Sequence, residues 1–262
     1  MSSDFVVPAQ TRWFDAHLHI IDPRFPLVPN QGYLPPEFTA GHYRRAMSEG
    51  LPEEVTLAGG AVVSGSFQGY DQSYLVNALK ELGSGFVGVA QVPADTGLDE
   101  LSRLNQAGVR ALRFNLYRGT AADLATLERT AALIHEHFNW HIELYVDASD
   151  LGELASLLPR LPRVSIDHLG LRADGLDTLK RLVEQGCYVK ATGFGRLDFD
   201  PVAAMAALYR CNPDALVFGS DLPSTRAPQP FQFTDLQRLR DAVGDEDFER
   251  VLWANARYLY GI

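Results

Sequence analysis

Short apolar runs alternate with amphipathic segments along the whole chain. Apolar runs that are rich in β-branched residues and bounded by turn residues are typical of buried strands. They cover Trp13–Ile21, Gly60–Ser64, Phe86–Val92, Val109–Asn115, His141–Asp147, Val164–Leu169, Tyr188–Gly193 and Leu216–Asp221. Between them, apolar residues recur every three or four positions, which predicts helices. These helices cover a segment near His42–Glu49, then Asp71–Leu82, Asp99–Ala107, Ala122–His137, Leu151–Leu158, Leu176–Glu184, Pro201–Tyr209, Thr234–Val243 and Asp247–Tyr260.

The strict alternation of strand and helix predicts a parallel barrel. Parallel neighbours need a crossover connection, which is right-handed almost without exception. Eight such units in 262 residues match the (β/α)8 TIM barrel, whereas doubly wound open sheets more often stop at five or six strands. No nucleotide-binding glycine pattern follows any predicted strand. We therefore expect one α/β domain that spans residues 1–262.

The longest segment without a helix or strand signal follows the first predicted strand. Residues 22–39 contain five prolines, with Tyr33 and Phe38 among them. A segment so rich in proline and polar residues is not core, and it lies on the barrel face where active sites form. Two interpretations stay open: a lid or wall of the pocket, or a surface excursion without a role.

The net charge of the chain argues against some classes of partner. The chain has 33 acidic and 23 basic side chains, a formal net charge of −10 with neutral histidines. Nucleic acids and anionic membranes need a basic footprint, so neither is expected as a partner. The uncharged stretch 55–70 is interrupted by glycines and serines and is not expected to span a bilayer. The N-terminus shows no leader pattern, so we expect a cytoplasmic protein that acts on a small molecule. A homo-oligomer stays open.

The first predicted strand carries a pair of histidines. His17 and His19 lie near its carboxyl end, two residues apart, and Asp15 precedes them by the same step. Because side chains alternate along a strand, these three are expected on one face. The other face must meet the helices, so we expect the polar face to point into the barrel.

Two more strand ends carry similar residues. The sixth predicted strand contains His168 and the eighth ends in Asp221. Because the carboxyl ends of barrel strands form the active site, we expect these two side chains to meet His17 and His19 over the barrel axis. Three imidazoles and one carboxylate can hold one divalent metal ion, Zn or Mn, that deprotonates a water. Without a metal, the imidazoles can polarise a carbonyl while Asp221 serves as general base. Both interpretations stay open.

A set of motifs, in order and with their spacing, resembles a known family. The motifs are Phe14-Asp15-Ala16-His17-Leu18-His19, Gly108-Val109-Arg110-Ala111-Leu112-Arg113-Phe114-Asn115, Asp167-His168-Leu169-Gly170, Val189-Lys190-Ala191-Thr192-Gly193, Phe218-Gly219-Ser220-Asp221-Leu222-Pro223 and Trp253-Ala254-Asn255-Ala256-Arg257-Tyr258-Leu259-Tyr260-Gly261. They span nearly the whole chain and resemble the amidohydrolase superfamily. Within it, the chain is similar to the "amidohydrolase 2" branch, which contains 2-pyrone-4,6-dicarboxylate lactonase and sugar-lactone hydrolases.

The resemblance implies hydrolysis of a cyclic ester or related bond. By this analogy His17, His19 and His168 would bind the carbonyl oxygen or a metal, and Asp221 would activate water. The residues expected to bind carboxylates or hydroxyls of a substrate are Arg113, Asn115, Tyr145, Lys190, Arg196 and Arg226, since guanidinium groups match carboxylates bidentately. For Lys190, a pocket cation and a helix-facing side chain stay equal alternatives. Tyr145 lines the pocket or belongs to the core.

The chain departs from the branch at three places. Metal-dependent members carry a histidine at the end of the fifth strand, where this chain has Tyr145. Pyrone-dicarboxylate lactonases tend to carry an arginine after Asp-His-x-Gly and a histidine after Asp-x-Pro, where this chain has Leu171 and Ser224. Arg172 and Arg226 lie one and two residues beyond these positions and are candidate replacements. These differences argue against a binuclear centre and leave the pyrone dicarboxylate unassigned as substrate.

Three functions are compatible with these residues. The first is a lactone hydrolase that needs no cofactor or uses one divalent metal. The second is a metal-dependent, non-oxidative decarboxylase of a small aromatic or enol acid on the same scaffold. The third is a binding barrel without catalysis, against which the complete set of three histidines and one aspartate argues.

Overall fold

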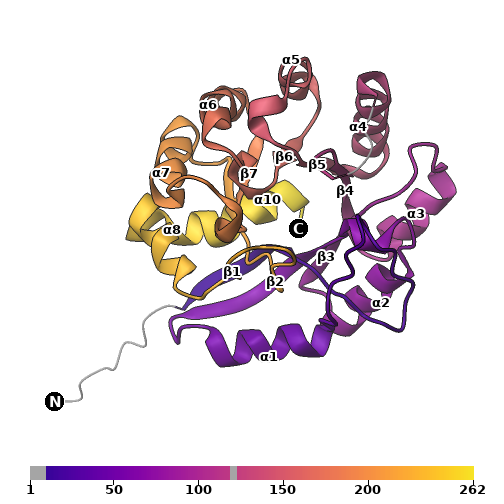
Figure 1. Ribbon diagram of the computed structural model, residues 1–262, viewed down its shortest axis with the longest axis horizontal. Helices are drawn as coiled ribbons and strands as arrows, with labels where there is room; N and C mark the ends of the chain where they lie inside the picture. Colours follow the sequence, from indigo (N-terminus) through magenta and orange to yellow (C-terminus); the bar gives the residue numbers. More distant parts are fainter. Residues whose placement is uncertain (1–9, 119–122) are drawn as a thin grey trace.

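The protein is described by a computed structural model that covers residues 10–118 and 123–262. Eight parallel strands stand side by side in chain order, with helices around them (Figure 1). They are β1 Thr11–Leu18, β2 Val55–Val63, β3 Phe86–Ala90, β4 Val109–Asn115, β5 His141–Tyr145, β6 Val164–Ile166, β7 Tyr188–Ala191 and β8 Leu216–Phe218. The segment after β8 returns to β1, where the Asp221 N–H donates to the His17 carbonyl at 2.7 Å and the His19 N–H to the Leu222 carbonyl at 2.8 Å. The predicted (β/α)8 barrel is confirmed.

Helices occupy the predicted positions with a few corrections. They are α1 Ala40–Gly50, α2 Ser73–Leu82, α3 Leu98–Gln106, α4 Leu124–Phe138, α5 Leu154–Leu157, α6 Leu176–Glu184, α7 Pro201–Cys211, α8 Asp235–Val243, α9 Asp245–Glu249 and α10 Asn255–Tyr260. The helix predicted over residues 151–158 shrinks to the four residues of α5, because Gly152 adopts a left-handed φ of +51°. The helix predicted from Asp247 is divided by a π-helical turn at Arg250–Ala254. The helix predicted from Ala122 starts outside the described residues. Within the described ranges, no helix is both long and apolar enough to cross a membrane.

The core has two layers, as strand alternation requires. Outward-facing side chains such as Ile142, Leu144 and Val189 pack against the helices. Inward-facing ones, among them Phe14, Ala61 and Val217, form a separate cluster in the barrel interior. Helix α10 contributes Ala256, Leu259 and Tyr260 to that inner cluster. Inward polar residues of the same strands therefore lie on top of an apolar floor.

Strand β1 does not follow simple alternation. Its register against β2 shifts between Trp13 and Phe14 and again between Asp15 and Leu18. Ala16 joins the inner cluster, while Asp15 accepts hydrogen bonds from Ser220 and from Tyr43 on α1. The prediction that Asp15 shares an inward face with the histidines was wrong, because these irregularities break the two-residue period. Burial raises the pKa of Asp15 to about 6 despite these hydrogen bonds.

Most strands end earlier than the sequence predicts, because the backbone changes direction at the active-site edge. β1 ends at Leu18, β6 at Ile166 and β8 at Phe218. Two of the residues that follow, His168 and Asp221, have left-handed φ angles of +52° and +60°. A residue in that region cannot continue a β-ladder. Their side chains are therefore placed by tight turns beyond the strands, not by the strands themselves.

Candidate active site

His17 lies fully buried at the carboxyl end of β1, between two carboxylates. Its Nε2 is 3.8 Å from Asp221 Oδ1 and its Nδ1 is 3.6 Å from Asp167 Oδ1. Neither ring nitrogen has a hydrogen-bond partner among the described residues. Burial lowers the pKa of His17 to about 4, against the opposing pull of Asp167. The imidazole is therefore neutral at pH 7, with a lone pair available.

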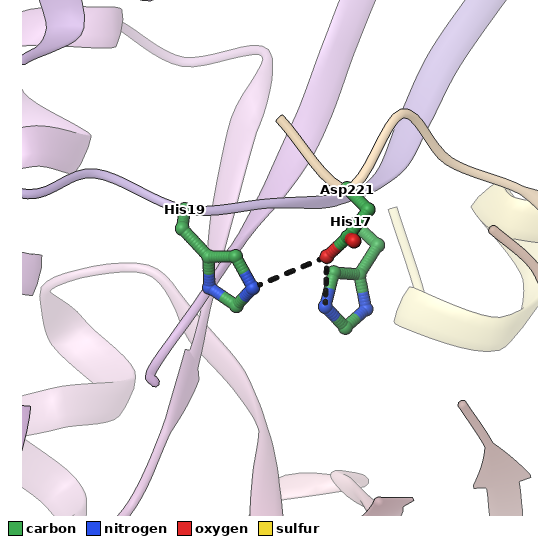
Figure 2. A group of neighbouring side chains, drawn as sticks. All are labelled: His17, His19 and Asp221. Atoms are coloured by element: carbon green, nitrogen blue, oxygen red, sulfur yellow. Dashed lines mark ion pairs between the residues drawn. The ribbon is translucent and has the colours of Figure 1, made fainter. Parts of the chain in front are cut away.

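His19 is oriented by the neighbouring strand. Its Nδ1 is 2.7 Å from the carbonyl oxygen of Val63 at the end of β2. Because a carbonyl only accepts, Nδ1 carries the proton and Nε2 of the neutral ring presents a lone pair. That Nε2 is 3.5 Å from Asp221 Oδ1. Figure 2 shows both imidazoles converging on the same carboxylate.

Asp221 is the carboxylate on which these groups converge. Its Oδ2 accepts from Arg196 Nε at 3.0 Å and Nη2 at 2.6 Å, and its Oδ1 accepts no hydrogen bond from the described residues. Burial is the largest influence and opposes ionisation, but Arg196 together with the neighbouring histidines holds the pKa of Asp221 well below its usual range. Asp221 is therefore ionised, with one oxygen fixed and the other open toward the histidines.

A second carboxylate beside the site escaped the sequence prediction. Asp167 Oδ2 accepts from Arg113 Nε at 3.0 Å and Nη2 at 2.8 Å. Arg113 reaches Asp167 across 54 positions of sequence, and it also donates to the Ser64 carbonyl at 3.0 Å. Despite burial, this arginine holds the pKa of Asp167 well below its usual range. The position of Asp167 directly before His168 could have identified it as a site residue from the sequence.

His168 completes the group. Its ring centroid is 5.0 Å from that of His17 and 5.1 Å from that of Tyr145. Burial lowers its pKa well below the usual range, so the ring is neutral. Its Nδ1 has no hydrogen-bond partner among the described residues. This nitrogen is buried on the side of Gly193, where a Cβ would come within 2.6 Å of it.

His19, His168 and Asp221 line an open pocket, whereas the fully buried His17 and Asp167 are not among its lining residues. The lining residues are His19, Tyr33, Gly65, Ser66, Phe67, Arg113, Asn115, Arg118, Tyr145, His168, Arg196, Asp221, Thr225 and Arg226. Most of the predicted site residues are among them. Tyr33 comes from the 22–39 segment, so that segment contributes to the wall; a lid movement stays a prediction. Arg118, three residues past Asn115, was missed because no periodicity extends into that loop.

Lys190 lies elsewhere. It is fully buried, with its Nζ 2.6 Å from Glu143 Oε2 and 3.9 Å from Asp167 Oδ1. It faces the barrel interior beneath the pocket and does not line it. Both alternatives for Lys190, a pocket cation and a helix-facing chain, were wrong. Glu143 on β5, which pairs with it, could not be connected to it from sequence alone.

The site's donors fit one divalent cation. His17, His19 and Asp221 each offer an unshared donor atom, and these atoms lie within 4.8 Å of one another. Ligands of a tetrahedral Zn²⁺ about 2.1 Å from the ion are roughly 3.4 Å apart, close to the separations from Asp221 Oδ1. His19 Nδ1 also donates to the Val63 carbonyl, the kind of hydrogen bond that orients a metal-binding imidazole. A second group, His17, Asp167 and His168, is equally compact.

Known proteins share this fold and these sequence features. The family model described as Amidohydrolase matches residues 14–262. A 2-pyrone-4,6-dicarboxylate hydrolase of Comamonas testosteroni is 31% identical over 161 residues, 60% of this chain and 51% of that protein, so the match spans about half of the relative's length. A 4-sulfomuconolactone hydrolase of Hydrogenophaga intermedia is 25% identical, covering 98% of this chain and 90% of that protein.

Solved structures agree on the fold. A probable 2-pyrone-4,6-dicarboxylic acid hydrolase of Acinetobacter baumannii, solved with citric acid bound, superposes with a TM-score of 0.80 at 22% identity, covering 95% of this chain and 99% of that one. An apo structure from Agrobacterium tumefaciens gives 0.82 at 22% identity, covering 97% and 98%. Because the family model matches nearly the entire sequence, this chain belongs to the amidohydrolase family.

Proposed function

We propose that this protein is a hydrolase that opens a small lactone carrying an anionic substituent. The observation that carries the proposal is the Asp221 carboxylate. It is buried and ionised, and one oxygen is open toward two imidazoles at the floor of a pocket. A carboxylate in this setting is suited to accept a proton from an attacking water. Relatives named for lactone hydrolysis support the same reaction class.

Asp221 acts as the general base in this proposal. Arg196 fixes Oδ2 with two hydrogen bonds, so only Oδ1 is free to take the proton. The same ion pair weakens Asp221 as a base while it keeps the group ionised at every working pH. Asp221 then takes a proton from the water only as that water attacks the carbonyl. Because Arg196 holds the carboxylate in one orientation, this step loses less entropy.

The histidines divide between two tasks. His168 lines the pocket and its ring is neutral, so the ring is suited to donate a hydrogen bond to the lactone carbonyl. A donor aimed at a developing oxyanion contributes about 10²–10³-fold to rate. His19 has no proton on Nε2 in its neutral form, since Nδ1 donates to Val63. It is therefore suited to accept or to ligate, not to polarise a carbonyl.

A metal ion is a suitable partner for the lone pair of His19. His17, His19 and Asp221 would hold one Zn²⁺ or Mn²⁺, which when bound supplies Lewis acidity and lowers the pKa of a coordinated water. Asp221 would then ligate the ion through Oδ1, the oxygen that takes the proton when no metal is bound, and His168 would still face the carbonyl.

Arginines and aromatic rings at the mouth would hold the substrate. Arg118 and Arg226 line the pocket, and neither has an acidic partner within 4 Å among the described residues. Arg226 lies over the Tyr33 ring at 4.4 Å, and Arg113 over Tyr145 at 5.0 Å. Guanidinium groups without a carboxylate attract one from a ligand. This excess of positive charge, in a chain of net charge −10, favours an anionic lactone.

The test is Asp221→Asn, assayed on sugar lactones, muconolactones and pyrone carboxylates with and without chelator. We expect kcat/KM to fall at least about 10³-fold while circular dichroism shows an unchanged fold. Asp177→Asn, at an exposed position on α6, is the matched control. Lactone turnover retained by the Asp221→Asn variant would refute the role of the base. Release of CO₂ from an aromatic or enol acid, lost on chelation, would favour the decarboxylase instead.

A further inference from the structure

The two carboxylates of the site each already have a positive partner. Arg113 forms two hydrogen bonds with Asp167, and Arg196 forms two with Asp221. The Asp221 pair matters most for a metal, because the candidate cation donors His17 and His19 face Oδ1 of that same carboxylate. A cation on Oδ1 would share one carboxylate with the guanidinium on Oδ2.

Arg196 is held firmly in this place. Its Nη2 also donates to the Thr225 carbonyl at 2.8 Å, and its side chain is only 9% exposed. Gly193 provides the space for it: a Cβ there would lie 3.1 Å from Arg196 Cδ and 2.6 Å from His168 Nδ1. Gly193 itself has a φ of +64°, which glycine adopts without strain. The guanidinium is therefore a built part of the site and not a mobile surface charge.

Arginine also differs from every other cation that could stand there. It cannot release its proton in a protein, so it does not make way for a metal by becoming neutral. Like charges that share one buried carboxylate repel each other strongly, because water screens them little. We propose that Arg196 weakens divalent-cation binding at His17, His19 and Asp221, so that loss of its charge converts this set into a tighter metal site.

Arg226 provides a matched comparison. It lines the same pocket, but it donates to the Asn30 carbonyl and stacks on Tyr33 instead of contacting an acid of the site. Removing its charge changes the net charge of the pocket by the same amount. A general change of pocket potential would thus appear in both variants, whereas the proposed effect belongs to Arg196 alone.

The experiment is a titration of chelator-treated, metal-free protein with Zn²⁺ alone, followed by calorimetry and by competition with a chromophoric chelator. We expect Arg196→Gln and Arg196→Met to bind Zn²⁺ at least tenfold more tightly than the unmodified protein. Arg226→Gln is expected within threefold of it. Either neutral variant is sufficient if circular dichroism shows that it is folded. Adding His19→Ala to that variant should abolish the gain, which locates the ion.

Several results would overturn the proposal. They are an unchanged or weaker Zn²⁺ affinity in a folded neutral variant, an equal gain in Arg226→Gln, or a gain that survives His19→Ala. The readout is binding and involves no lactone. Failure of the proposed hydrolysis would therefore leave this inference intact, and the reverse also holds.

Discussion

The barrel interior contains two buried polar clusters that differ in how well they are satisfied. The lower cluster consists of His141, Glu143, Lys190 and Tyr260. Glu143 Oε2 accepts from Lys190 Nζ at 2.6 Å, and Oε1 accepts from the Tyr260 hydroxyl at 2.7 Å and faces His141 Nε2 at 3.1 Å. Both carboxylate oxygens are thus fully used. Despite burial, the charge of Lys190 lowers the pKa of Glu143 to about 2.

The upper cluster consists of His17, His19, Asp167, His168 and Asp221. There, one oxygen of each carboxylate and several ring nitrogens have no hydrogen-bond partner among the described residues. An unsatisfied buried polar group costs free energy, so such groups persist where function requires them. Burial and charge therefore do not by themselves mark an active site. The upper cluster has several unpaired polar atoms beside a pocket. In the lower cluster, which serves the fold, His141 Nδ1 is the one such atom among the described side chains.

Glu143→Gln tests that the lower cluster is structural. Removing one charge of a buried pair leaves Lys190 with only the more distant Asp167, 3.9 Å away, and the free energy of unfolding should fall by about 3 kcal/mol. For a chain of this size, that lowers Tm by roughly 10 °C. Chemical denaturation gives the free energy, and kcat of the folded fraction should stay within about threefold.

The double variant Glu143→Met/Lys190→Met is the control for Glu143→Gln. Replacing both charges by apolar side chains of similar size removes the uncompensated ammonium, and most of the lost stability should return. A kcat that falls in Glu143→Gln far more than stability does would show that the lower cluster acts on the chemistry. The lower cluster would then belong to the catalytic machinery as well as to the fold.

His168→Ala tests whether the upper cluster is catalytic, because it should lower activity more than stability. Loss of a donor to the carbonyl should lower kcat about 10²-fold, close to 3 kcal/mol of transition-state stabilisation. His168→Asn keeps a donor near Nδ1 and tolerates the left-handed backbone at this position, so it should recover part of the activity. Steady-state kinetics of both variants gives the result. Equal kcat for His168→Ala and the unmodified protein would remove His168 from the mechanism.

Much of the barrel could be predicted from the sequence, because strand and helix periods are local signals. β4 matches its predicted bounds from Val109 to Asn115, and the alternation there correctly placed Arg113 and Asn115 on one face. Predictions failed where the backbone leaves regular structure. The left-handed φ of His168 and Asp221, and the register shifts around Asp15, follow from tertiary packing and have no two-residue or 3.6-residue period.

Partnerships across the barrel could not be predicted at all. The ion pairs Arg113–Asp167, Lys190–Glu143 and Arg196–Asp221 join residues 54, 47 and 25 positions apart. Each charged side chain alone was compatible with a pocket role. Only the arrangement of strands decides which charges neutralise each other and which remain for a ligand, and that arrangement assigned Lys190 to the fold.

The smallest expected effect concerns the pH dependence of stability. Burial lowers the pKa of His141, although its hydrogen bond to Glu143 opposes this. In the unfolded chain the group has an ordinary pKa of about 6.5. Below that pH the unfolded state binds a proton that the folded state does not. The free energy of unfolding should therefore fall as the pH is lowered, by at most about 1.4 kcal/mol per pH unit for this one group.

His141→Asn isolates this contribution. Other buried groups also titrate: His17 and His168 act in the same direction, whereas Asp15, with its raised pKa, acts in the opposite one. The difference between the variant and the unmodified protein cancels them. Urea denaturation of metal-free protein between about pH 5 and 8 should give a flatter profile for His141→Asn below about pH 6.5 and parallel profiles above it. His137→Asn, at an exposed position on α4, is the control. Parallel profiles throughout would mean that His141 takes up its proton inside the folded barrel, so that the lower cluster would be less completely closed to water than its hydrogen bonds indicate.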